Sequence, residues 1–258
     1  MEARPRIASD LAIKGSLIEE TYTVFHGWDY DLGKTENLTH VRQKNQIGAK
    51  TAAWAQRLTK AIGRRLDPAG RDRPLVDLAK SGCDRDAWKP LLLFHLARGD
   101  FLVRDFLVHW LYPQFVGGAY RLRTEDVLSY LHMLSLRDEL EWSGSWNETT
   151  TRRVASGLLR IAVDFGLLTG TQSREFSSYH LPEQSFLYLL HSLLKQEANA
   201  RRVIEAEDWR MYLMDISDVE RELLRLHQFR KLHYEVAGSL SQITLSAEFA
   251  TDLAMETC

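Results

Sequence analysis

The stretch from Trp146 to Leu181 reads WNETTTRRVASGLLRIAVDFGLLTGTQSREFSSYHL and constrains the fold more than any other part of the chain. Apolar residues recur in its first half at the spacing of one helix face, at Val154, Leu158, Ile161 and Phe165. Glycine then ends the helix, and LLTGTQSREFSSYHL is typical of two short strands around a small polar tip. A helix with a polar, basic leading end followed directly by a hairpin is the order found in a winged helix. The pattern therefore predicts a winged-helix-like region over 124–181.

The face of this helix opposite the apolar stripe carries hydroxyl and guanidinium groups. Proteins that bind duplex DNA use such a helix in the major groove, where main-chain amides, hydroxyls and arginines hold phosphates and reach base edges. An exposed helix surface whose threonines merely cap its first turn is an equally good reading of the same residues. The candidate DNA-binding residues here are Thr149, Thr150, Arg152, Arg153, Ser156, Arg160 and, at the tip of the hairpin, Arg174.

A second candidate surface lies in a basic stretch near the N-terminus. A helix over 36–45, a turn at Gly48 and a helix over 51–66 together predict a helix-turn-helix-like region over 36–66. Trp54, Leu58, Ala61 and Ile62 are expected to point inward, with a basic stripe beside them. A charge run is more often just a solvated face, but the density of bases between 41 and 73 favours DNA binding. The candidate residues are Lys50, Arg57, Lys60, Arg64 and Arg65.

Composition limits the alternatives. The 258 residues, 45% hydrophobic and 26% charged, are typical of a folded protein with a mainly α fold and short β-hairpins. The formal net charge of -2 excludes a generally basic nucleic-acid protein, so bases from separate helices would have to gather into one cationic strip. Pro113 and the Gly117-Gly118 pair are expected to break the helices there. We place a boundary at that break, between an N-terminal domain (1–117) and a C-terminal domain (118–258) that ends in a helix plus hairpin (217–245).

Catalytic, metal and membrane functions are not favoured. Two cysteines and nine scattered histidines match no metal-ligand spacing, and no nucleophile or phosphate-loop motif is complete. His95, near Asp100, is better interpreted as a hydrogen-bonded core histidine, and most tryptophans as core residues. No apolar segment has the length of a signal peptide core or a membrane span. We therefore expect no cofactor, no metal, no membrane contact and a cytoplasmic location.

Several blocks of the chain resemble a known family. The blocks KGSLIEETYTVFHGWD, NLTHVRQKNQIGAKT, PLLLFHLARGDFLVRDFLVHWLYP, LLRIAVDFGLL and EDWRMYL are similar, in number and order, to those of BrxA proteins from BREX bacteriophage-exclusion systems. The resemblance implies a mostly helical, cytoplasmic protein with helix-turn-helix elements that binds double-stranded DNA. It also implies partners among the other defence proteins, which include a DNA methyltransferase and ATPases.

These observations predict a non-catalytic, double-stranded-DNA-binding component of a BREX system that acts mainly through phosphate contacts. One alternative is a protein–protein adaptor that meets DNA only indirectly. Another is a subunit of a methylation complex that binds DNA only once assembled. An adaptor needs an uncharged surface patch, whereas a DNA-binding protein needs positive surface.

Overall fold

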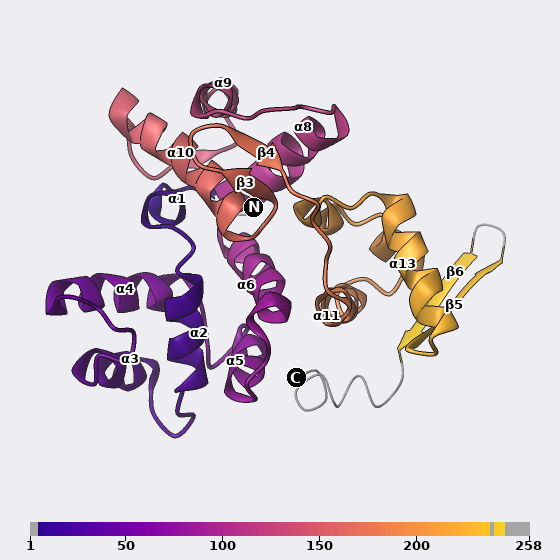
Figure 1. Cartoon of the computed structure of the whole chain (residues 1–258), viewed down its shortest axis with the longest axis horizontal. Helices are drawn as coiled ribbons and strands as arrows, with labels where there is room; N and C mark the ends of the chain where they lie inside the picture. The colour runs from indigo at the N-terminus through magenta and orange to yellow at the C-terminus, as the bar shows by residue number, and fades with distance from the viewer. Residues whose placement is uncertain (1–4, 238–239, 246–258) are drawn as a thin grey trace.

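Helices dominate the computed structural model, which describes residues 5–237 and 240–245 (Figure 1). The predicted mainly α fold is confirmed. The structure does not describe residues 1–4, 238–239 and 246–258, which belong to the expected domains. The turn predicted for the terminal hairpin, at Gly238-Ser239, is among them. In chain order the helices are α1 (Asp10–Lys14), α2 (Ile18–His26), α3 (Lys34–Gln43), α4 (Ala52–Arg65), α5 (Arg73–Lys80), α6 (Arg85–Gly99), α7 (Phe101–Asp105), the π-helix η1 (Phe106–Leu111), α8 (Tyr112–Val116), α9 (Thr124–Ser135), α10 (Glu148–Asp164), α11 (Glu183–Leu194), α12 (Ala200–Ile204), the 3-10 helix η2 (Glu207–Tyr212) and α13 (Ile216–Gln228).

The described strands form three separate two-stranded sheets. β1 (Arg6–Ile7) pairs in parallel with β2 (Glu141–Trp142). β3 (Leu168–Gly170) and β4 (Arg174–Phe176) form an antiparallel hairpin directly after α10. β5 (Leu232–Ala237) and β6 (Leu240–Leu245) form another after α13.

The N-terminal segment packs against the second half of the chain. Besides the β1–β2 pairing, α1 lies across the middle of α10. The contact is so close that a Cβ built on Gly157 would lie 2.0 Å from the main-chain oxygen of Ala12. Only glycine leaves room for the two backbones at this distance. Gly157 therefore determines how the first residues of the chain reach α10.

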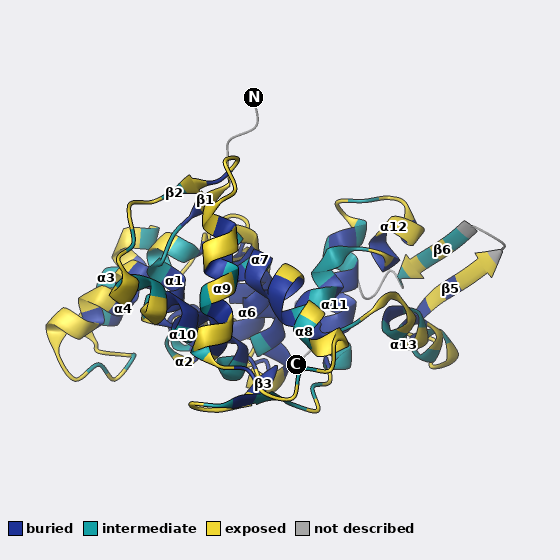
Figure 2. Ribbon diagram, turned by 90° about the horizontal axis from the view of Figure 1, so that it is seen from above, coloured by how far each residue is buried: buried dark blue, intermediate teal, exposed yellow. Residues whose placement is uncertain are grey.

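Most buried apolar side chains form one cluster that extends from Ile7 to Tyr234 (Figure 2). α6 runs through its middle, and every residue from Ala87 to Ala97 except Lys89 is buried on it. Such a helix, apolar on all sides, is what the PLLLFHLA run predicts for a buried core element. The division into 1–117 and 118–258 stays a prediction, and this cluster crosses it.

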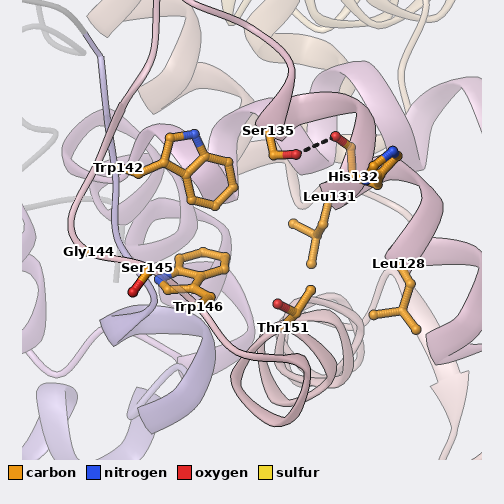
Figure 3. A pocket seen from close by; sticks show the side chains of 9 residues that line it. All are labelled: Leu128, Leu131, His132, Ser135, Trp142, Gly144, Ser145, Trp146 and Thr151. Carbon is orange, nitrogen blue, oxygen red and sulfur yellow. Dashed lines mark hydrogen bonds between the residues drawn. The ribbon is translucent and has the colours of Figure 1, made fainter.

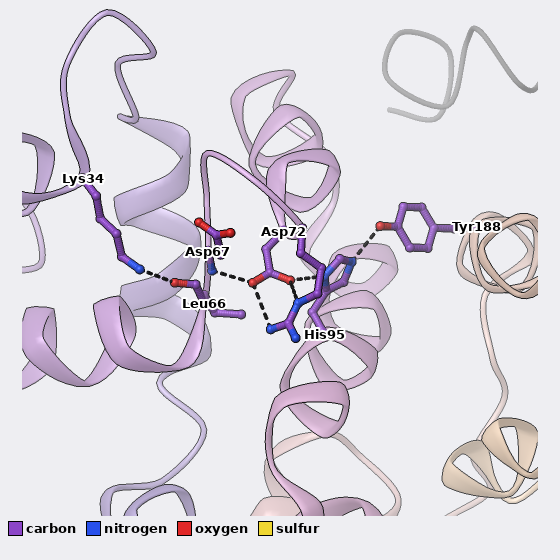
Figure 4. A network of polar contacts seen from close by, with 7 residues as sticks. Lys34, Leu66, Asp67, Asp72, His95 and Tyr188 are labelled. Carbon is purple, nitrogen blue, oxygen red and sulfur yellow. Dashed lines mark hydrogen bonds and ion pairs between the residues drawn. The ribbon is translucent and has the colours of Figure 1, made fainter. Parts of the chain in front are cut away.

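A buried polar network connects α6 with its neighbours (Figure 4). His95 Nδ1 lies 2.6 Å from Asp72 Oδ1, and its Nε2 lies 2.7 Å from the Tyr188 hydroxyl on α11. Asp72 also accepts a hydrogen bond from the main-chain N–H of Asp67. Burial acts to raise the pKa of Asp72, but the hydrogen bonds from His95 and Asp67 outweigh it and lower that pKa. His95 is thus a hydrogen-bonded core histidine, although its partner is Asp72 rather than Asp100.

Two local expectations are wrong, the first of them only in part. Helical structure continues through Pro113 to Val116, because η1 is a π-helix with shifted hydrogen bonds and Pro113 falls in the first turn of α8. The helix ends at Gly117 and Gly118, as expected. Trp54 does not point inward: it is 44% exposed in the first turn of α4, while Leu58, Ala61 and Ile62 are buried as expected. Helix periodicity cannot tell whether the core reaches as far as the first turn.

Candidate nucleic-acid interface

The first turns of α10 present the predicted polar face to solvent. Asn147 caps the helix by accepting a hydrogen bond from the Thr150 N–H at 2.8 Å. Val154, Leu158 and Ile161 are buried on the inner side as the sequence predicts. The outer residues border an open hollow of about 390 Å³, whose lining is Glu148, Thr149, Arg152, Arg153 and Ser156.

The three arginines of this face differ in their electrostatic surroundings. Arg152 pairs with Glu125 of α9 at 3.1 Å, and Arg160 lies 3.9 Å from Asp164 one turn later. Arg153 is exposed and forms no ion pair with any residue that the structure describes. The positive charge still available to a phosphate on α10 is therefore concentrated at Arg153.

Arg174 is not displayed at the hairpin tip, contrary to expectation. It is the first residue of β4, only 7% exposed, and exchanges two main-chain hydrogen bonds with Leu122. Burial lowers the pKa of its guanidinium, and its Nε has no hydrogen-bond partner among the described residues. The tip itself is formed by Gly170, Thr171 and Gln172, which are exposed. The bridge to Leu122 is a long-range contact, so nothing in the local sequence could reveal it.

The outer face of α4 carries the second group of predicted residues. Thr51 caps the helix, and Ala55, Leu58, Ala61 and Ile62 pack inward. Its four predicted exposed bases are all at the surface, and none forms an ion pair with a described residue. We call this set the α4 cationic face; it consists of Lys50, Arg57, Lys60 and Arg64.

Arg65 has a different role from its neighbours on α4. Its side chain is only 9% exposed and donates hydrogen bonds to the main-chain oxygens of Gly15 and Asp10, at 2.8 and 3.1 Å. Burial lowers the pKa of this guanidinium, while the charge of Asp10 raises it. Arg65 therefore attaches the end of α4 to α1 and is not available as an exposed phosphate contact.

The two faces are connected through α1 and the start of α2. In Figure 1, α4 and α10 lie on the same side of the molecule with α1 between them. A groove of about 280 Å³ at this junction gathers Lys14, Lys89 and Arg160. Sequence reasoning missed Lys14 and Lys89, because they come from separate elements that share no motif. Acidic residues lie among these bases, so the expected single cationic strip is interrupted here by Glu19, Glu20 and Asp164.

Metal and membrane sites are not evident in the described part of the chain. No three His, Cys, Asp or Glu side chains within 5–237 and 240–245 are grouped as a metal ion would require. Over the same residues, each helix is too short or too polar to span a bilayer.

Comparisons with known proteins agree with the fold. The family model described as BrxA matches residues 8–192. No curated protein matches the chain. A solved structure of an uncharacterized protein from Magnetospirillum magneticum is similar, with a TM-score of 0.58 and 18% sequence identity over 81% of this chain and 100% of that one. This second likeness is one of fold alone.

Proposed function

The chain belongs to the BrxA family, and from that premise we propose that it is a non-catalytic component of a BREX phage-defence system that binds double-stranded DNA. In this proposal α3 and α4 form a helix-turn-helix-like unit, and α9, α10 and the β3–β4 hairpin form a winged-helix-like unit. Binding would take place in the cytoplasm, beside partners such as the methyltransferase and ATPases of the system.

The α4 cationic face is the observation that carries the proposal. Four bases along one exposed helix and its leading turn carry no neutralising acid among the described residues, although the whole chain has a formal net charge of -2. Exposed, unpaired bases are free to exchange their counterions for phosphates.

The α10 face supports the same proposal through geometry. The capped first turn of α10, with Thr149, Arg153 and Ser156, borders a hollow that a phosphate group could enter. Helix leading ends favour anions because their amide N–H groups and dipole point outward. Glu148 and Glu125 oppose this attraction, so α10 would contribute orientation and α4 most of the electrostatic free energy.

The proposal is tested by a mobility-shift series with duplex DNA at increasing salt. Arg153→Glu with Arg160→Glu should weaken binding and leave the helical circular dichroism unchanged. Arg221→Glu is the matched control, because it reverses an exposed arginine on α13, away from both faces. No binding at low salt, or an affinity that does not change with salt, would show the phosphate-contact mechanism to be wrong. Unaltered binding by the double variant would show that α10 takes no part in binding and would leave the α4 cationic face as the whole site.

A second candidate function, the adaptor, is favoured by an apolar surface patch. Val116 and Tyr120 are 66% and 73% exposed, and the neighbouring Phe115 packs edge-on against Phe176 of the hairpin, with ring centroids 5.2 Å apart. Apolar groups exposed together are typical of protein contact sites. Val116→Glu with Tyr120→Glu should then abolish co-purification with the other defence proteins in nuclease-treated extracts and leave DNA binding unchanged. Co-purification that disappears with nuclease treatment alone would count against the adaptor.

A further inference from the structure

A hollow lies beside the first turn of α10, between that helix, α9 and the loop after β2. Its volume is about 520 Å³, within the range of roughly 300–1,000 Å³ typical of small-molecule sites. Figure 3 shows the two indole rings of Trp142 and Trp146 on one side of the space and Leu131 and Leu128 on the other. We refer to it as the tryptophan pocket.

The walls of the pocket are held by contacts from distant parts of the chain. Main-chain hydrogen bonds from Glu141 to Pro5 and from Ser143 to Ile7 hold the strand that carries Trp142. Trp142 and Trp146 pack edge-to-face with ring centroids 4.8 Å apart. Gly144, with φ of +114°, allows the loop between them to fold back. The two rings are therefore positioned before any ligand arrives.

The lining selects an uncharged, flat group. It contains no Asp, Glu, Lys or Arg side chain. The indole N–H groups of Trp142 and Trp146 and the ring of His132 make no hydrogen bond to any residue in the described ranges. In Figure 3 both indole nitrogens lie on the side of their rings away from Leu128 and Leu131, so the tryptophans offer the pocket aromatic carbon surface. Aromatic walls suit a flat heterocycle better than an aliphatic chain.

The position of the pocket suggests which heterocycle it takes. Thr151 lines the tryptophan pocket, and its neighbours Arg152 and Arg153 line the hollow on the outer face of α10. The two hollows thus lie on different sides of the same first turns of α10, so a strand held by Arg153 would bring a nearby nucleotide to the end of the helix that carries the tryptophans. Bases stack on aromatic side chains with little dependence on sequence.

We propose that the tryptophan pocket binds a single unpaired nucleobase. This rests on the proposed DNA-binding function, with α10 holding a phosphate of the same strand. A fully paired duplex keeps its bases stacked, so the pocket would act where a base is bulged or extruded and would make binding selective for such sites.

The test uses the full chain and two labelled duplexes that differ by one bulged 2-aminopurine. The bulged duplex should bind about five-fold tighter or more, the effect of one base–aromatic stack, and the 2-aminopurine fluorescence should fall. Trp146→Ala should remove this preference while keeping affinity for the paired duplex. Because removal of a tryptophan can disturb folding, Ser135→Phe provides a second variant that fills the pocket from the exposed end of α9.

The matched control is Met133→Phe, on the same helix but outside the lining. Equal affinity for the two duplexes, or a preference that survives Trp146→Ala and Ser135→Phe, would overturn the pocket proposal and leave duplex binding intact. A third arm uses free 2-aminopurine riboside. If the riboside binds and Ser135→Phe prevents it, while neither duplex binds, the nucleobase site stands and the DNA-binding function falls.

Discussion

α4 and α10 are both amphipathic helices with arginines on their outer faces, but they are integrated into the molecule in different ways. α10 contacts α1, α9 and β3, and its inner side includes Val154, Gly157 and Leu158 in the core. α4 packs mainly on α3 and is tied to α1 by Arg65. Two of the α10 arginines face carboxylates, whereas the four bases of the α4 cationic face do not.

This difference separates two requirements of a nucleic-acid surface. A rigid element sets the orientation of a ligand, and unpaired charge provides long-range attraction. In this protein the rigid helix has partly neutralised arginines, while the unpaired charge lies on a more peripheral helix. Variants on each helix should therefore affect different measurements.

The largest effect is expected at the α1–α10 contact. Gly157→Val would place side-chain atoms where the Ala12 main chain lies, so the free energy of unfolding should fall by about 3 kcal/mol, at the upper end for an overpacked core. Urea denaturation measures this change. Gly99→Ala is the matched control, because its Cβ would meet atoms of Arg71 and Arg65 only at 3.4 and 3.6 Å. Equal stability of the two variants would mean that α1 does not pack on α10 as described.

Reversal of the α4 cationic face should have the next largest effect, on binding rather than folding. The triple variant Arg57→Glu, Lys60→Glu, Arg64→Glu should have a lower affinity for duplex DNA. The slope of log Kd against the logarithm of the salt concentration should also fall by roughly 3, about one unit for each lost phosphate contact. Thermal unfolding should be nearly unchanged, because the three side chains are exposed. If the slope did not change, the phosphate contacts would have to be made by α10 instead.

Two adjacent arginines of α4 are expected to have different roles: Arg65 holds α4 to α1, and Arg64 contacts DNA. Arg65→Ala should lower the free energy of unfolding by about 2 kcal/mol, since it removes charged hydrogen bonds to Gly15 and Asp10. Arg64→Ala should stay within about 0.5 kcal/mol of the original stability and weaken DNA binding instead. If both variants changed only affinity, the attachment assigned to Arg65 would be incorrect.

The smallest effect is expected on how stability depends on pH, through Asp100, whose charge interacts with that of Arg65. Asp100 caps α7, and burial raises its pKa to about 6, although Val103 N–H and the charge of Arg65 oppose the shift. The folded pKa is above the unfolded value of about 3.9, so the stability that Asp100 contributes is present below about pH 4 and is lost as the pH rises through 6.

Asp100→Asn keeps a capping oxygen and removes this titration. The stability of the variant relative to the original chain should therefore increase between pH 4 and 6 and remain level above that range. Denaturation curves at several pH values test this. A difference that does not vary with pH would mean that the pKa of Asp100 is not raised in the folded protein.

The sequence by itself determined the elements whose signals are local. The helices over 52–65 and 148–164 follow from apolar spacing, and the strands after α10 follow from a glycine stop and a small polar tip. It also separated exposed bases such as Arg57 and Arg153 from inward apolar residues.

Only the tertiary structure decided which of the selected bases are available. Arg65 and Arg174 have the same local pattern as their exposed neighbours, but one is buried against Gly15 and the other beside Leu122. The tryptophan pocket and the groove at Lys14 likewise require residues far apart in the chain. Periodicity reports the side of a helix that faces inward, whereas the burial and pairing of a charge depend on what the folded chain places against it.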